Sequence, residues 1–153
     1  MIMTQEQLIV KAQLLFEQIE VFVRQACTEG RPLHEVESDL WGRMLDLGRL
    51  LLQSYVAGYG QGDLGPTIEH AGGVLRRLDQ LHTKWYESVF GGFGIARYVY
   101  GTRETQKHEL IPLDNILALP KEDDRPDGRV CPRILGVFPS PPHPHPDAGI
   151  VPA

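Results

Sequence analysis

The chain has 153 residues, and 15 Lys and Arg stand against 20 Asp and Glu, which gives a net charge of −5. No segment is basic overall, and this argues against a strong electrostatic grip on nucleic acid. Cys27 and Cys131 lie in unlike sequence contexts and indicate neither a disulfide framework nor a metal site. The first residues show no signal peptide, and apolar runs such as residues 50–52 are far too short to span a bilayer. We therefore expect a cytoplasmic protein without membrane contact.

Residues 4–60 are predicted to form an antiparallel hairpin of two helices. Thr4 and Gln7 have the spacing of a capping box. Gly30 is a suitable stop for the first helix, and Pro32 suits the first turn of the second. Apolar residues then recur at intervals of three and four, which marks one apolar face on each helix. These are Leu8, Ala12, Leu15, Phe16, Ile19, Val23 and Ala26 in the first helix, and Val36, Leu40, Met44, Leu47, Leu51 and Tyr55 in the second.

The densest acidic cluster of the chain, residues 34–39 (HEVESD), opens the second predicted helix. Glu35 and Asp39 lie one turn apart and could offer two carboxylates to a metal ion. Acidic residues in a first turn also complement the helix dipole, by about 0.3–1 kcal/mol each, and we favour this interpretation. We likewise favour packing over base stacking for Trp41 and Trp85.

Residues 61–120 are predicted to be rich in β-strands. The runs 84–90 and 93–100 flank Gly91 and Gly92, a pair typical of a tight hairpin turn. A strand follows these glycines, so they do not resemble a phosphate-binding loop, which needs a helix N-terminus. A further strand is expected at 107–111. Residues 67–77 favour another hairpin, although 75–83 could also form a short helix. The fold class is therefore α+β, with a helical hairpin followed by a small antiparallel β region.

Residues 121–153 are predicted to be a disordered, proline-rich tail. They hold 8 of the 12 prolines and show no sustained period of 2 or 3.6. Pro, Arg, Gly and Ala, which are encoded by GC-rich codons, dominate the segment. We therefore expect the tail to be an out-of-frame reading of a GC-rich gene.

Several separated blocks of the chain resemble the N-terminal region of ISKra-type insertion-sequence transposases. The similarity covers roughly residues 4–120 and no part of the tail, and the order of the blocks adds to its specificity. The blocks are 12–20 (AQLLFEQIE), 29–41 (EGRPLHEVESDLW), 62–67 (GDLGPT), 86–91 (YESVFG), 97–104 (RYVYGTRE) and 111–114 (IPLD).

The resemblance implies that a complete relative moves a DNA element with an acidic triad and divalent metal in a later ribonuclease-H-like domain. That domain should begin beyond residues 112–114, and we expect that this chain does not encode it. No catalytic carboxylate can then be carried over, and we expect no metal site and no cofactor. Similar transposases often carry Cys pairs around these strands, which make a zinc ribbon; residues 102–109 contain no Cys.

Three hypotheses follow. The first is a catalytically inactive N-terminal fragment of a transposase, with at most weak contacts to transposon-end DNA or to protein, including a homo-oligomer through the helical hairpin. The second is a separately expressed first-frame product of a two-frame element, acting as a DNA-binding or regulatory protein. The third, which we rank low, is a metal-dependent enzyme that uses His34, Glu35 and Asp39. The DNA contacts are expected from a cluster of cations near the β region, which comprises Arg76, Arg77, Lys84, Arg97, Arg103 and Lys107.

Overall fold

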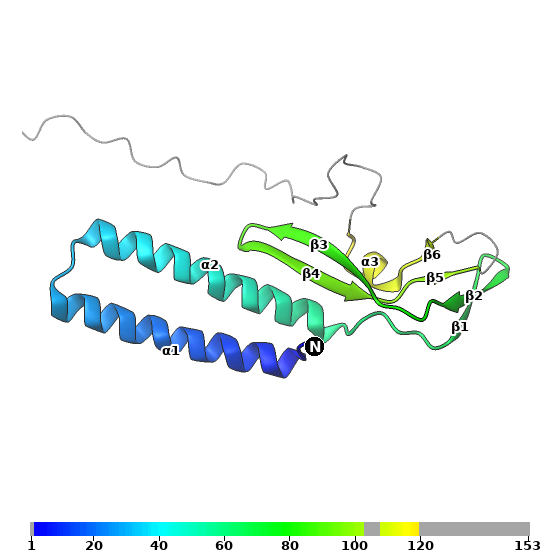
Figure 1. Cartoon of the computed structure of the whole chain (residues 1–153), viewed down its shortest axis with the longest axis horizontal. Helices are drawn as coiled ribbons and strands as arrows, with labels where there is room; N and C mark the ends of the chain where they lie inside the picture. The colour runs from blue at the N-terminus through cyan, green and yellow to red at the C-terminus, as the bar shows by residue number, and fades with distance from the viewer. Residues whose placement is uncertain (1, 103–107, 120–153) are drawn as a thin grey trace, which may run out of the picture.

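The computed structural model describes residues 2–102 and 108–119. Within them the chain is α+β, as predicted: two long helices are followed by small antiparallel sheets (Figure 1). The predictions for Arg103, Lys107 and the tail at 121–153 lie outside the described residues. No helix in the described part of the chain is long and apolar enough to cross a membrane.

Helices α1 (Gln5–Glu29) and α2 (Leu33–Gly58) lie side by side and antiparallel (Figure 1). The predicted capping box is confirmed, because Thr4 N–H donates to Gln7 Oε1 at 3.0 Å and Gln7 N–H donates to Thr4 Oγ1 at 3.3 Å. Gly30 ends α1 with a φ of 66°, a left-handed conformation that favours glycine.

The seam between the two helices is narrow. The residues of α1 that are fully buried are Leu8, Ala12, Ile19 and Ala26. Five other members of the predicted apolar faces remain between 43 and 54% exposed: Phe16, Val23, Met44, Leu51 and Tyr55. The apolar faces predicted from the periodicity are therefore wider than the surface that the two helices bury against each other.

Two antiparallel sheets follow the helices. Strands β1 (Thr67–His70), β2 (Gly73–Arg77), β5 (Tyr100–Gly101) and β6 (His108–Leu110) form a four-stranded sheet in the order β1-β2-β5-β6. The hairpin of β3 (His82–Ser88) and β4 (Gly91–Arg97) is inserted between β2 and β5 and forms a separate sheet that packs along α2. The hairpin expected at 67–77 is confirmed, and the alternative helix at 75–83 is wrong.

The turn of the β3–β4 hairpin differs from the prediction. Its two turn residues are Val89 and Phe90, whereas Gly91 and Gly92 begin β4 and pair with Ser88 and Glu87. Ser88 Oγ stabilises the turn, because it accepts from Phe90 N–H at 3.1 Å and donates to Gly91 O at 2.7 Å. Gly91 has a φ of 107°, so a glycine is needed where the strand begins rather than at the turn.

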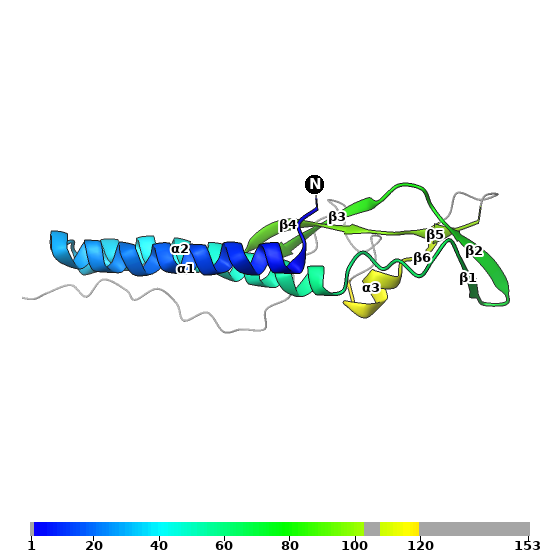
Figure 2. The ribbon, with the colours of Figure 1, turned by 90° about the horizontal axis from the view of Figure 1, so that it is seen from below.

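A short helix that the sequence did not predict, α3 (Pro112–Ile116), completes the fold. Seen from below, it lies on one side of the layer formed by the strands (Figure 2). Leu113 of α3 is fully buried and joins Phe93 and Ile95 of β4 in a hydrophobic core. Partly buried apolar residues of α2, including Leu52 and Val56, pack against this core and connect the helices to the sheet.

Candidate functional site

A buried ion cluster joins α3 to the β3–β4 hairpin. Arg97 Nη1 lies 2.8 Å from each carboxylate oxygen of Asp114, and Lys84 Nζ lies 3.7 Å from Asp114 Oδ2. Both cations are almost completely buried, and the Asp114 side chain is 16% exposed. Two of the cations expected to contact DNA therefore direct their charge at Asp114 inside the protein rather than at solvent.

The strand pattern explains this burial. Antiparallel pairing places Lys84 opposite Ile95, and side chains two residues apart share a face of the sheet. Lys84 and Arg97 therefore lie on the same face as Phe93 and Ile95, the face that is turned to the core. This alternation was visible in the sequence and is the signal that could have identified the two cations as internal.

A second cluster centres on Asp63, in the loop between α2 and β1. One carboxylate oxygen accepts from Gly65 N–H at 2.9 Å, and the other lies 2.5 Å from Arg77 Nη1. The hydrogen bond from Gly65 and the guanidinium of Arg77 hold the pKa of Asp63 below its usual value. The Arg77 guanidinium also lies over the Tyr98 ring, 4.7 Å from its centroid.

Tyr100 of β5 ties this loop to the four-stranded sheet. Its hydroxyl donates to Gly65 O at 2.8 Å and accepts from Leu64 N–H at the same distance. The ring is completely buried. Gly62 lies against α3, and a Cβ there would be 3.0 Å from Leu113 N, so the loop fits only with glycine at this position.

We call the region formed by these two clusters the hub. It brings together three of the blocks that carry the transposase resemblance, residues 62–67, 97–102 and 111–114. Sequence reasoning did not identify Asp63, Tyr100 or Asp114 as partners. Their side-chain contacts with other elements join positions 14 to 37 residues apart, which no local spacing indicates.

The two other predicted cations that the structure describes, Arg76 and Arg77, differ in their exposure. Arg76 is exposed on β2, where it pairs with Thr67 on one side and Gly101 on the other. Arg77 is half-buried and bound to Asp63. Among the predicted cations that the structure describes, Arg76 is thus the one whose side chain is exposed.

The acidic cluster at the start of α2 surrounds an arginine. Arg31 Nη2 lies 2.8 Å from Asp39 Oδ2 and 3.5 Å from Glu35 Oε2. These carboxylates raise the pKa of Arg31. Within residues 2–102 and 108–119, no three His, Cys, Asp or Glu side chains gather closely enough to hold a metal ion. Glu35 and Asp39 therefore form a surface ion-pair network with Arg31.

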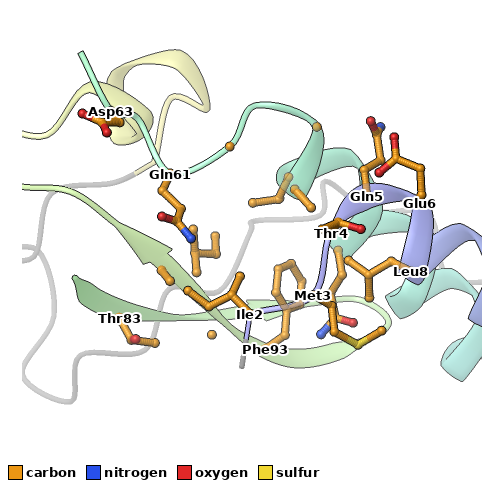
Figure 3. A pocket seen from close by; sticks show the side chains of 18 of the residues that line it. Ile2, Met3, Thr4, Gln5, Glu6, Leu8, Gln61, Asp63, Thr83 and Phe93 are labelled. Atoms are coloured by element: carbon orange, nitrogen blue, oxygen red, sulfur yellow. The ribbon is translucent and has the colours of Figure 1, made fainter. Parts of the chain in front are cut away.

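A cavity of about 800 Å³ lies where the helices meet the β3–β4 hairpin. Figure 3 shows Met3, which precedes α1, and Leu8 of α1 facing Phe93 of β4, with Thr83 and Gln61 at the border of the cavity. Its walls mix apolar side chains with polar ones such as Gln5 and Gln53, and Asp63 at one end is bound to Arg77. The described residues around it assemble no nucleophile together with a base.

Trp85 covers the outer face of the β3–β4 hairpin. A Cβ at Gly92 would lie 2.6 Å from Trp85 Cζ2, so the indole rests directly on the glycine backbone. Its Nε1–H donates to Glu87 Oε1 at 2.6 Å. These contacts agree with the packing role expected for Trp85. They also explain why a glycine stands at position 92 without any role in phosphate binding.

Comparisons of the chain with protein-family models, with curated proteins and with solved structures find no match.

Proposed function

We propose that residues 2–119 are a non-catalytic accessory module of an insertion-sequence transposase, which acts in the cytoplasm and contacts DNA weakly through β1 and β2. The observation that carries this proposal is the hub, where three separated blocks of the transposase resemblance interlock. Because these separated blocks contact one another in one folded unit, they support the view that this unit as a whole corresponds to the N-terminal region of such transposases.

The placement of charged groups supports a role in binding rather than in chemistry. The carboxylates of the hub, Asp63 and Asp114, are each bound to an arginine, and Glu35 and Asp39 share Arg31. Groups held in ion pairs of this kind stabilise the fold and are poor candidates for metal-dependent strand cleavage. We therefore expect no cutting or joining of DNA by this module in Mg²⁺ or Mn²⁺.

The DNA contact should be weak because few cations can reach phosphates. Each phosphate contact contributes about −0.9 to the slope of log affinity against log salt concentration. Because Arg77 is bound to Asp63, Arg76 alone would give a slope of about −1, and Arg103 and Lys107 would bring it to about −3. Lys84 and Arg97 are left out of this count because they are buried.

The test is fluorescence anisotropy with a short DNA duplex of arbitrary sequence at several salt concentrations. Arg76→Ala should weaken binding and reduce the magnitude of the slope by about 1. Lys11→Ala, which removes an exposed cation from α1, is the matched control and should leave both unchanged. If Arg76→Ala and Lys11→Ala bind equally well, the β1–β2 contact is wrong. Metal-dependent cleavage lost in Asp39→Asn would contradict a non-catalytic role.

A further inference from the structure

One side of the helical hairpin is apolar and has no covering element among the described residues. We define the hairpin face as six exposed side chains, three from each helix: Ile9, Phe16, Val23, Met44, Leu51 and Tyr55. Each is between 38 and 54% exposed, although all are large and apolar. Exposed apolar patches of this extent on a helical protein mark an interaction surface.

Helix geometry places the six residues on the same side. In α1 the buried seam residues fix the direction toward α2, and Ile9, Phe16 and Val23 follow each other at intervals of seven, about 45–85° to one side of it. In α2 the other three residues lie about 60–100° from the buried Ser54. Because the helices are antiparallel, these two rotations point to the same side of the hairpin.

Near the turn between the two helices, the hairpin carries charged and ion-paired groups away from the hairpin face. Arg43 lies over the Phe22 ring at 4.2 Å from its centroid, and Arg31 lies over the same ring at 5.7 Å. Glu35 and Asp39 are bound to that same Arg31. These ion-paired groups distinguish this side from the hairpin face, although α1 also exposes Leu14 and Val21 away from that face.

The β region borders the hairpin face and leaves its α2 side chains about half exposed. The core that joins α2 to the sheet uses Leu52 and Val56. The turn residue Phe90 packs on Gly48, where a Cβ would lie 2.4 Å from the ring. Gly48 lies between Met44 and Leu51 on one stripe of α2, so Phe90 borders the hairpin face there. Leu52 and Val56 lie at least about 60° around the helix from the face residues of α2, so most of the β3–β4 hairpin packs on a different side.

We infer that the hairpin face binds a second copy of this chain, so that two hairpins form an antiparallel four-helix bundle. Three apolar residues at seven-residue spacing on α1 are typical of a helix that packs into another helical layer. The face is also suited to a twofold axis parallel to the helices, since that axis sets α1 of one copy against α2 of the other in antiparallel orientation.

The size of the face agrees with a stable dimer. A helix of 25 residues is about 38 Å long, and two helices packed 8–10 Å apart present a face about 20 Å wide. Such a face would cover about 750 Å² on each copy, close to the roughly 800 Å² per partner of a standard interface. The inference is independent of the proposed function, because it stands whether or not the β region contacts DNA.

The chain offers a matched pair of variants to test this inference. Phe16 on the hairpin face and Leu14 outside it are both 52% exposed and lie two residues apart on α1. Neither belongs to the buried seam, so Phe16→Glu and Leu14→Glu should both retain their helical circular dichroism. Sedimentation equilibrium of the full chain should give the mass of two chains for the wild type and for Leu14→Glu. Phe16→Glu should give the mass of one chain.

A second measurement keeps the test independent of any single variant. The melting temperature of a dimer rises with protein concentration, so it should do so for the wild type and not for Phe16→Glu or Leu51→Glu. Added salt should preserve or strengthen the dimer, because each copy carries a net charge of −5. A wild-type chain that remains monomeric at every concentration would overturn the inference. So would a dimer that Leu14→Glu disrupts as strongly as Phe16→Glu.

Discussion

The two halves of this protein use their apolar and charged residues in opposite ways. The β region is small, yet it buries Val99, Tyr100 and Leu113 completely and encloses the Asp114 ion cluster. The helical hairpin has longer elements, but it leaves Phe16 and Leu51 about half exposed. The hub is closed by its own contacts, whereas the hairpin has an apolar side that its own chain does not cover within the described residues.

This difference separates two ways of stabilising a small domain. In the hub, contacts between distant segments hold short strands that would be unstable alone. In the hairpin, local helix formation is strong, and the capping box and Gly30 fix its ends. Most helical stability in proteins nevertheless comes from packing of an apolar face. The comparison therefore predicts that substitutions in the hub act within one chain, while substitutions on the hairpin face act through association.

The largest effect is expected from Asp114→Ala. The substitution leaves the buried Arg97 and Lys84 without the carboxylate that they share, and removing one partner of a buried ion pair costs about 3–5 kcal/mol. Urea denaturation at a fixed protein concentration would measure the loss. Asp46→Ala is the matched control, because its pair with Arg49 is exposed and should contribute less than about 1 kcal/mol. Equal losses for the two variants would contradict the importance of the buried cluster.

A smaller, pH-dependent effect is expected at Asp63. The native environment lowers the pKa of this carboxyl, so the carboxylate stabilises the fold above the unfolded-state pKa of about 3.9. That contribution is lost as the pH falls through the lower pKa of the folded state. The difference in melting temperature between wild type and Asp63→Asn should therefore be largest at neutral pH and shrink in acid. Asp79→Asn, at an exposed position after β2, should show no such trend. A difference that grows in acid would contradict the proposed hydrogen bonding.

The sequence predicted those parts of the fold that depend on local signals. The capping box, the glycine that ends α1 and the hairpin of β1 and β2 all follow from spacing or turn chemistry. The turn of the β3–β4 hairpin was misplaced, because Val89 and Phe90 resemble strand residues and tertiary packing of Phe90 on Gly48 decides their position.

The site was harder to predict because its contacts are long-range. Lys84 and Arg97 were assigned to DNA from charge alone, although alternation with Phe93 and Ile95 already placed them on an apolar face. Asp114 can pair with Lys84 and Arg97 because α3, a helix of five residues, packs against the β3–β4 hairpin. Short helices without long periodicity are poorly marked in sequence.

Amide hydrogen exchange of the full chain at low and high protein concentration tests the contrast between the two regions most directly. If the hairpin face is completed by a second copy and the hub is closed within one chain, exchange in α1 and α2 should slow as concentration rises. Exchange in β3 and β4 should change much less. Phe16→Glu should abolish the concentration dependence in the helices, and Leu14→Glu should retain it. Helical exchange that is the same at both concentrations would contradict the account, as would equal slowing in helices and strands.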